Sequence, residues 1–334
     1  MKDIEKTQHF SKEALLIDGL VEYIPTDAIL IEPFYGNGDL AQNSKRSFSE
    51  YYDLLFKEGE HYRDTLKNPP DYKNKWVITN PPYLAKNKAK DKSYFVNSKY
   101  DDLYKIAIST LLESEGGILI IPINFFADER SKNIRQVFFK NFIIKRLNIY
   151  LDSMFDNTNY NVCSFFFERG TSKNISIPTY IYENSTITNT IINLNQDFDY
   201  RLGGDFFHLL KSNKPLFSRI TINKPQNATN ISVVCIDKTN EPLHFYYTEE
   251  PYFGKDSDRN IATLSYNGVL TEEQQKKIIE KSNEIINSFR KETFNLCLTN
   301  YRDRSRKRIG FMEAYQVATL AFNEIINAVP ARQT

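Results

Sequence analysis

The chain has 334 residues, of which 41% are hydrophobic and 25% charged, so it is long enough for roughly two domains with sizeable apolar cores. Its 43 lysines and arginines nearly balance its 42 acids, which gives a formal net charge of +1. This balance excludes a uniformly basic surface, and any site for a polyanion must be a local feature of the chain.

Cysteine and histidine are too scattered to predict a metal site. Cys163, Cys235 and Cys297 form no Cys-x-x-Cys pair, and the four histidines add no zinc-ligand spacing. We therefore expect neither a metal nor a structural disulfide, which fits a reducing compartment. The first residues are charged where a signal peptide would be apolar, and no run of about 18 apolar residues occurs. The sequence predicts a cytoplasmic protein with no membrane association.

Strand and helix patterns alternate through the first half of the chain. An apolar stripe predicts a helix over 13–24, and the apolar run at 27–32 predicts a buried strand that ends in a glycine turn. Further strands are expected at 47–53, 75–79, 117–122, 143–151 and 161–168, and a further helix at 101–114. This alternation is typical of an α/β fold with a mostly parallel sheet covered by helices on both faces.

The pattern changes after about residue 170. Short strands are expected within 171–200 and 223–253. Helical patterns return at 271–290, where Thr271 and Gln274 are spaced for a capping box, and at 311–327. We therefore expect an α/β domain over 1–170 and a mixed α+β region over 171–334.

The sequence Asn80-Pro81-Pro82-Tyr83 directly follows the strand predicted at 75–79, and ligands of open α/β sheets bind at the carboxyl ends of strands. Because the prolines fix the backbone and remove two N–H donors, the Asn80 amide oxygen and the Pro81 carbonyl can converge on one amino group. Tyr83 adds a flat face for stacking on a nucleobase, and since stacking needs only the ring, we expect Tyr83→Phe to be tolerated. A loop that is merely stiffened by proline is the alternative.

The segment EPFYGNGD at 32–39 lies at the carboxyl end of the strand predicted at 27–32. Its two glycines allow a ligand to approach the backbone closely. The segment lacks the third glycine of the dinucleotide fingerprint and the Gly-Lys-Ser/Thr ending of a phosphate loop. These departures argue against a dinucleotide, ATP or GTP as the ligand.

In this order the two motifs resemble those of the amino-methyltransferases of DNA, whose pattern is Asp/Glu-Pro-Phe-x-Gly-x-Gly followed by Asn-Pro-Pro-Tyr. With the glycine motif first, the chain is similar to the γ class of N6-adenine DNA methyltransferases, which mostly belong to type II restriction–modification systems. The resemblance implies a Rossmann-like, S-adenosylmethionine-dependent catalytic domain over 1–170 and a target-recognition region for double-stranded DNA over 171–334. It implies methyl transfer to adenine N6 of a base rotated out of the duplex. It also implies a cognate restriction endonuclease acting separately, and a place at the nucleoid of a prokaryote or in a virus-infected cell.

The resemblance implies roles for individual residues. Asn80, Pro81, Pro82 and Tyr83 form the catalytic loop. Glu32 takes the place of the usual Asp that orders the methionine amino group, Asp53 (or else Glu50) binds the ribose hydroxyls, and Asp64 accepts from the cofactor's adenine amine. The alternative for each acid by itself is a solvated surface carboxylate. The residues expected to contact S-adenosylmethionine are Phe10, Ser11, Glu32, Pro33, Phe34, Gly36, Gly38, Asp53 and Asp64.

Two local basic segments suit a DNA backbone. Residues 86–92 carry a net charge of +3 directly after the catalytic loop, and residues 301–308 carry +4. Arginines of the second segment could instead read guanine edges, and solvated loops are the alternative for both segments. Tyr160, in a hairpin at 155–162, is expected to help hold the extruded base. The expected DNA contacts are therefore Lys86, Lys88, Tyr160, Arg302, Arg304, Arg306, Lys307 and Arg308.

Other substrates present the same planar amino group. The chemistry of the loop also fits N4 of cytosine, an RNA base and the amide of a protein glutamine, so these stay open as alternatives. A DNA-binding subunit without catalysis is the non-enzymatic alternative, and the intact motifs at 32–39 and 80–83 argue against it.

Overall fold

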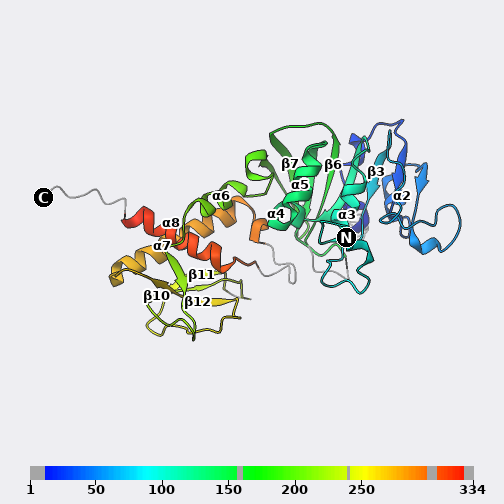
Figure 1. Ribbon diagram of the computed structural model, residues 1–334. Helices are drawn as coiled ribbons and strands as arrows, with labels where there is room; N and C mark the ends of the chain where they lie inside the picture. Colours follow the sequence, from blue (N-terminus) through cyan, green and yellow to red (C-terminus); the bar gives the residue numbers. More distant parts are fainter. Residues whose placement is uncertain (1–11, 156–160, 239–240, 299–306, 327–334) are drawn as a thin grey trace, which may run out of the picture. The chain divides into compact units, whose positions relative to one another are not determined.

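The computed structural model describes residues 12–155, 161–238, 241–298 and 307–326. The chain forms two compact units, Met1–Leu202 and Gly203–Thr334. Figure 1 labels the elements of each unit in chain order.

The first unit is built on a sheet that, in the described part of the chain, has eight strands in the order β2-β1-β3-β4-β6-β5-β7-β8. The strands are β1 (Leu30–Glu32), β2 (Glu50–Tyr51), β3 (Trp76–Thr79), β4 (Gly116–Pro122), β5 (Phe142–Tyr150), β6 (Val162–Arg169), β7 (Asn174–Glu183) and β8 (Thr186–Asn195). The predicted Rossmann-like α/β fold is confirmed. The expectation of a mostly parallel sheet is confirmed, since the pairings set every strand except β6 and β8 in one direction; β6 runs antiparallel to β4 and β5, and β8 to β7. Short connections join β5 to β6 and β7 to β8, and such connections allow only antiparallel pairing.

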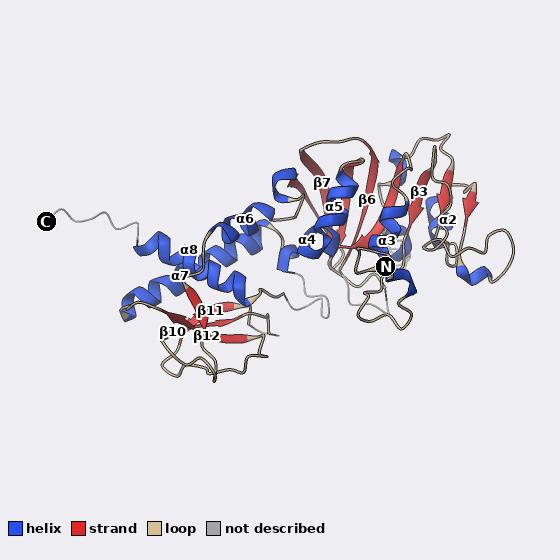
Figure 2. Cartoon of the chain, in the orientation of Figure 1, coloured by secondary structure: helices blue, strands red, loops and turns tan. Residues whose placement is uncertain are grey.

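The helices of the first unit are mostly short. They are α1 (Lys12–Leu15), α2 (Asp39–Ser44), α3 (Leu103–Thr110), α4 (Asn124–Ala127) and α5 (Lys132–Phe139), with 3₁₀ turns η1 (Val21–Tyr23), η2 (Leu54–Phe56), η3 (Ser93–Phe95), η4 (Glu129–Ser131) and η5 (Gln196–Phe198). In Figure 2, α3, α4 and α5 lie on one side of the sheet, and α3 packs against α5. The sequence patterns did not predict α4 and α5.

The continuous helix predicted over 13–24 is wrong. Gly19 has φ +61°, a left-handed conformation that ends a helical path, so only α1 and η1 are helical there. The apolar stripe nevertheless reports burial correctly, since Leu16, Ile17 and Leu20 all lie in the core between this segment and the sheet.

Residues 171–202 depart from the predicted division of the chain. We expected them in the C-terminal region, but β7 pairs with β5 and continues the first sheet, and the two units divide between Leu202 and Gly203. The buried residues Ile175, Ile177 and Ile181 alternate with more exposed ones along β7. This alternation predicts a strand, but it does not say which sheet the strand joins.

Arg135, on α5, is a fully buried cation that holds the main chain after β4. Its Nη1 donates to the carbonyls of Phe125 (2.8 Å) and Asp128 (2.6 Å), and its Nε donates to the carbonyl of Asp199 (3.0 Å). Burial lowers the pKa of Arg135 to about 10, so the guanidinium stays charged at neutral pH. The bond to Phe125 satisfies a carbonyl of α4 that the short helix leaves without a partner, and the bond to Asp199 ties this segment to a distant part of the chain.

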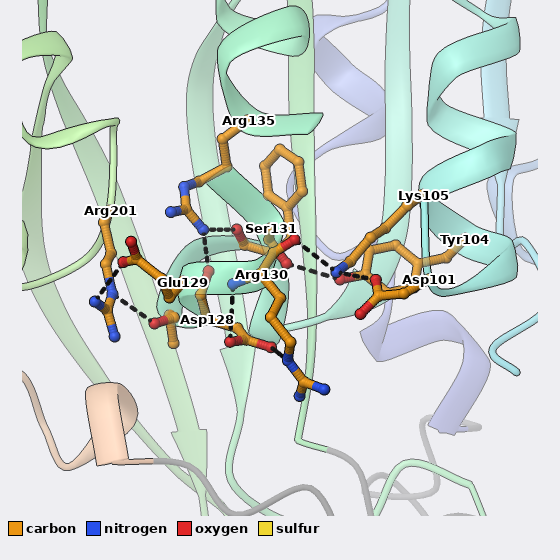
Figure 3. Close-up of polar contacts among 11 residues, drawn as sticks. Asp101, Tyr104, Lys105, Asp128, Glu129, Arg130, Ser131, Arg135 and Arg201 are labelled. Atoms are coloured by element: carbon orange, nitrogen blue, oxygen red, sulfur yellow. Dashed lines mark hydrogen bonds and ion pairs between the residues drawn. The ribbon is translucent and has the colours of Figure 1, made fainter. Parts of the chain in front are cut away.

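Two further basic side chains, those of Arg201 and Lys105, donate hydrogen bonds to the same segment (Figure 3). Arg201 donates from Nε to the carbonyl of Ala127 and from Nη1 to the carboxylate of Glu129, each at 2.9 Å. The buried Lys105 of α3 donates to the carbonyl of Arg130 at 3.2 Å. The segment that follows the central strand β4 is therefore fixed by side chains from three separate parts of the chain.

We expect Arg135→Met to lower the free energy of unfolding by about 3 kcal/mol, because the carbonyls of Phe125 and Asp199 lose the donor that Arg135 supplies in a buried place and the carbonyl of Asp128 keeps only the N–H of Ser131. Arg130→Met is the matched control. Its side chain is 61% exposed and pairs with Asp128, so its loss should cost less than about 1 kcal/mol. Urea unfolding followed by circular dichroism measures both, and equal losses would contradict the role given to Arg135.

In its described residues, the second unit combines an antiparallel sheet with three α-helices, which confirms its predicted mixed α+β character. Its sheet has the order β11-β10-β12-β9. The elements are α6 (Gly204–Ser212), β9 (Phe217–Arg219), β10 (Ala228–Val234), β11 (His244–Tyr247), β12 (Ile261–Tyr266), α7 (Glu272–Glu292), η6 (Leu296–Leu298) and α8 (Phe311–Ile326). The predicted capping box of Thr271 and Gln274 starts α7, which packs against β10 and β11.

Of the helices within the described ranges, none has both the length and the apolar character needed to span a bilayer.

Candidate active site

A pocket of about 530 Å³ lies at the carboxyl ends of β2, β1 and β3, three neighbouring parallel strands. Its volume is in the range of small-molecule and cofactor sites. The residues that line it are Leu16, Glu32, Pro33, Phe34, Tyr35, Gly36, Asn37, Asp39, Leu40, Asp53, Leu54, Arg63, Asp64, Thr65, Leu66, Asn80, Pro82, Tyr94, Leu103 and Phe155.

The glycine turn between β1 and α2 forms one wall of the pocket. Gly36 (φ +56°) and Gly38 (φ +84°) both adopt the left-handed conformation that favours glycine. A Cβ on Gly38 would lie 2.8 Å from the hydroxyl oxygen of Tyr35, whereas a Cβ on Gly36 would meet no atom within 4 Å. The Gly36 N–H donates to Asp53 Oδ2 at 2.8 Å, which ties the turn to the end of β2.

Glu32 is a buried acid with an unused acceptor. Its side chain is 1% exposed, and Oε2 has no hydrogen-bond partner within the described residues. Burial, together with the nearby charges of Asp39 and Asp53, raises the pKa of Glu32 to about 9. A buried carboxyl oxygen without a partner costs stability, so its position suits a ligand that brings a cationic donor.

The charged residues of the lining are predominantly acidic. They are Asp39, Asp53 and Asp64, against the single cation Arg63, while its raised pKa keeps the buried carboxyl of Glu32 protonated at neutral pH. Such a lining attracts a cationic ligand and repels one that carries several phosphates. This charge pattern agrees with the absence of phosphate-loop and dinucleotide motifs from the sequence.

Asp53 and Glu50, the two candidates for a ribose contact, differ in their surroundings. Asp53 lines the pocket, where Oδ2 accepts from Gly36 and Oδ1 from the N–H of Leu55 at 2.8 Å. Glu50 is not among the lining residues, and it forms an ion pair with Lys75 at 2.5 Å. The geometry therefore favours Asp53.

Asp64 lies across the pocket beside Tyr94. The Tyr94 hydroxyl donates to Asp64 Oδ2 at 2.9 Å. Burial, followed by the bond to Asp64, raises the pKa of Tyr94 to about 12, so the hydroxyl keeps its proton at neutral pH. Both side chains line the pocket, and each carboxylate oxygen of Asp64 has a further lone pair for a ligand.

The Asn-Pro-Pro-Tyr loop contributes Asn80 and Pro82 to the lining, whereas Pro81 and Tyr83 are not among the lining residues. The Tyr83 hydroxyl is placed to donate to Asn80 Oδ1 or to the carbonyl of Ile120, the latter at 2.7 Å. The bond to Oδ1 orients the Asn80 amide and leaves the oxygen's second lone pair for a ligand. Sequence reasoning gave Tyr83 only a stacking role and missed this contact.

The chain after Tyr83 is fixed to the start of α3. The N–H of Leu84 donates to Asp102 Oδ1 at 3.1 Å, and the N–H of Leu103 donates to the carbonyl of Leu84 at 3.2 Å. Farther along, Ala89 and Phe95 are buried in a small cluster with Leu103. Lys86 and Lys88 point outward from this anchored segment as exposed side chains next to the pocket-lining loop.

The remaining predicted residues lie elsewhere. Gly38 is the N-cap of α2 and does not line the pocket. In the second unit, the main chain of Lys307 pairs with Asp237, and the Arg308 guanidinium donates to the carbonyl of Arg259 at 3.1 Å. Phe10, Ser11, Tyr160, Arg302, Arg304 and Arg306 lie outside the described residues.

Sequence reasoning missed several lining residues. Arg63 and Thr65 flank the predicted Asp64, and Phe155 opens the hairpin segment that was singled out for Tyr160, so proximity in sequence was a usable signal for these three. Tyr94 and Leu54 come from the short 3₁₀ turns η3 and η2, which carry no motif. Within the described ranges, no group of three or more His, Cys, Asp and Glu side chains is arranged to hold a metal ion.

No protein-family model matches the chain, and no curated protein matches it either. The solved structures that resemble it include the modification subunit of a putative type I restriction enzyme from Vibrio vulnificus YJ016 (TM-score 0.38, 14% identity, 52% of this chain and 47% of that chain). They also include the type I restriction enzyme EcoKI M protein (0.39, 12%, 52% and 48%) and a type I restriction-modification methyltransferase subunit from Streptococcus thermophilus (0.40, 11%, 58% and 57%). The chain spans about half the length of these proteins. Likenesses at this level do not assign a reaction, which has to be inferred from the pocket.

Proposed function

We propose that the protein is a site-specific DNA methyltransferase that moves a methyl group from S-adenosylmethionine to N6 of an adenine rotated out of the duplex. One observation carries the proposal. A single pocket is lined both by the glycine turn with the unpartnered Glu32 and by Asn80 and Pro82 of the Asn-Pro-Pro-Tyr loop. The proposed cofactor site and the proposed site for the target amino group would then share one pocket.

The pocket residues fit S-adenosylmethionine. When bound, this cofactor supplies a methyl group on a positively charged sulfur. Glu32 would accept from its ammonium group, which explains a buried carboxyl oxygen without a partner. Asp53 would accept from the ribose hydroxyls and Asp64 from the adenine amine, and the acidic lining as a whole favours the cationic ligand.

The Asn-Pro-Pro-Tyr loop would activate the target amine. An adenine amino lone pair is delocalised into the ring, so the nitrogen is a poor nucleophile. Asn80 Oδ1 and the Pro81 carbonyl would accept its two N–H bonds and stabilise the positive charge that develops as the nitrogen attacks. Rotating the base out of the duplex costs a few kcal/mol, and stacking on an aromatic side chain returns about 1–3 kcal/mol.

DNA is the proposed partner, and a cognate restriction endonuclease that acts separately belongs to the same proposal. The exposed Lys86 and Lys88 extend from the loop that follows Tyr83, where they would meet the phosphates flanking an extruded base. The basic segment at 301–308 is the proposed contact of the second unit, whose role would be target recognition.

A methyl-transfer assay with tritiated S-adenosylmethionine tests the proposed substrate class. The protein is incubated in parallel with double-stranded DNA of varied sequence, with RNA and with total protein, and acid-precipitable label is counted. We expect label in DNA alone. Label in RNA or protein would contradict the proposed substrate, and no transfer to any of the three would contradict the enzymatic assignment.

We expect Tyr83→Phe to lower kcat by about tenfold, because the variant keeps the ring but loses the hydroxyl that orients Asn80. This revises the expectation from sequence that the change is tolerated. Tyr94→Phe is the matched control, since it removes the bond to Asp64 and should weaken cofactor binding with little effect on kcat. Steady-state kinetics separates the two, and an unchanged kcat in Tyr83→Phe would show that orientation of Asn80 does not need the hydroxyl.

A further inference from the structure

β8 is an edge strand of the large sheet. In the described part of the chain it is the last strand in the order and pairs with β7 alone. Residues 184–195 include no charged residue, no proline and no glycine. Natural edge strands usually carry such residues, which block pairing with another chain, so an edge ten residues long without them is a template for a further strand.

The alternating direction of main-chain hydrogen bonds shows which residues of β8 direct their N–H and C=O groups away from the sheet. The N–H of Leu151 donates to the carbonyl of Tyr182 at 2.9 Å, so Tyr182 directs its main-chain groups toward β5. Successive residues alternate, so Ile181 faces β8, and its partner Thr188 faces back toward β7. The residues that direct N–H and C=O away from the sheet are therefore Ile187, Asn189, Ile191 and Asn193.

The side chains of this edge are arranged symmetrically about Asn189. Ile187 is 53% exposed and Ile191 is 63% exposed, and each lies two residues from Asn189 on the same face of the strand. A strand with this arrangement is complementary to its own copy running in the opposite direction.

We propose that β8 pairs antiparallel with β8 of a second copy of this chain, around a two-fold axis at Asn189. Asn189 then lies opposite the partner's Asn189, and Ile187 lies opposite the partner's Ile191. These are hydrogen-bonded pairs, each of which exchanges two main-chain bonds, so about six such bonds form and four isoleucines gather on one face. The two sheets join into one continuous sheet across the axis.

The register follows from the residues. If the pairing shifted by one residue, residues whose N–H and C=O groups point away from the sheet would lie opposite residues whose groups point toward β7. If it shifted by two, the exposed isoleucines would lie opposite asparagine or serine. No charge lies along the edge to repel a copy of itself, which favours a second copy over a charged partner. The inference does not depend on the proposed function, because β8 is at the opposite end of the strand order from β2, β1 and β3, which carry the pocket.

Charge variants at the axis test this pairing. Asn189→Lys and Asn189→Asp each place two like charges directly opposite each other, so each should raise the Kd for dimerisation by more than about tenfold. An equimolar mixture of the two variants should restore the dimer. Analytical ultracentrifugation over a concentration series measures all three, and circular dichroism confirms that the variants are folded.

Asn193→Lys is the matched control, since in this register Asn193 meets the partner's Ser185 and no second lysine. We expect it to stay dimeric. A wild-type chain that is monomeric at every concentration would overturn the proposal. So would a dimer that Asn189→Lys leaves intact, or one that Asn193→Lys disrupts to the same degree.

Discussion

We expect Asn80→Ala to lower kcat by about 100- to 1,000-fold, while the Kd for S-adenosylmethionine should change by less than about threefold. The reason is that Asn80 Oδ1 is proposed to accept from the target amine and to stabilise charge that exists only during transfer. The hydrogen bond from the Gly36 N–H to Asp53 Oδ2 does not involve Asn80, so we expect it to persist in the variant. An interaction made only in the transition state affects turnover and leaves ground-state binding unchanged.

Asn87→Ala is the control for this prediction. It removes the same side chain seven residues along, at an exposed position outside the pocket. Single-turnover kinetics and equilibrium cofactor binding are measured on both variants. Equal losses of turnover and cofactor affinity in Asn80→Ala would contradict the role of Asn80 and point to a general loss of pocket structure.

We expect Glu32→Gln to weaken the binding of S-adenosylmethionine by about 100-fold, because the bound ammonium group would favour the ionised form of Glu32 in this buried site and glutamine cannot ionise. Glu22→Gln, at an exposed position, should leave binding unchanged. Isothermal titration calorimetry measures both, and normal cofactor affinity in Glu32→Gln would remove Glu32 from the cofactor site.

We expect Glu32→Gln to become more stable relative to the wild type as pH rises. The folded state raises the pKa of Glu32 from the ordinary value of 4.5 to about 9, so folding favours the protonated acid. Its contribution to stability is complete below 4.5 and is lost as pH rises toward 9, at up to about 1.4 kcal/mol per pH unit. Glutamine does not ionise, so the free energy of unfolding of Glu32→Gln relative to the wild type should increase through this window. Urea unfolding at a series of pH values checks the slope, and a parallel pH dependence in both proteins would contradict the burial argument.

The sequence was most informative about the strands that carry the pocket. Short apolar runs before the glycine turn and before Asn80 predicted β1 and β3, and ligand sites at the carboxyl ends of parallel strands follow from that topology. The capping box at Thr271 predicted the start of α7, because that signal is local. The sheet that β7 joins is set by contacts distant in sequence, and alternation along one strand does not contain that information.

The candidate site was predictable where residues belong to motifs, and only there. Glu32 and Asn80 were predicted to share one ligand site because each lies at the carboxyl end of its own strand, and both line the pocket. Tyr94 reaches the pocket from a loop whose path depends on the packing of Phe95 against Leu103. The contact between Tyr83 and Asn80 depends on side-chain orientation within the loop, which the order of residues does not fix.

The identity of the methylated nucleoside tests the central claim most directly. DNA is isolated from a host without endogenous methylation that expresses either the wild-type chain or Asn80→Ala, digested to nucleosides and analysed by mass spectrometry. We predict N6-methyldeoxyadenosine with the wild-type chain and little or none with Asn80→Ala. N4-methyldeoxycytidine, or no methylated nucleoside from the wild-type chain, would contradict the assignment.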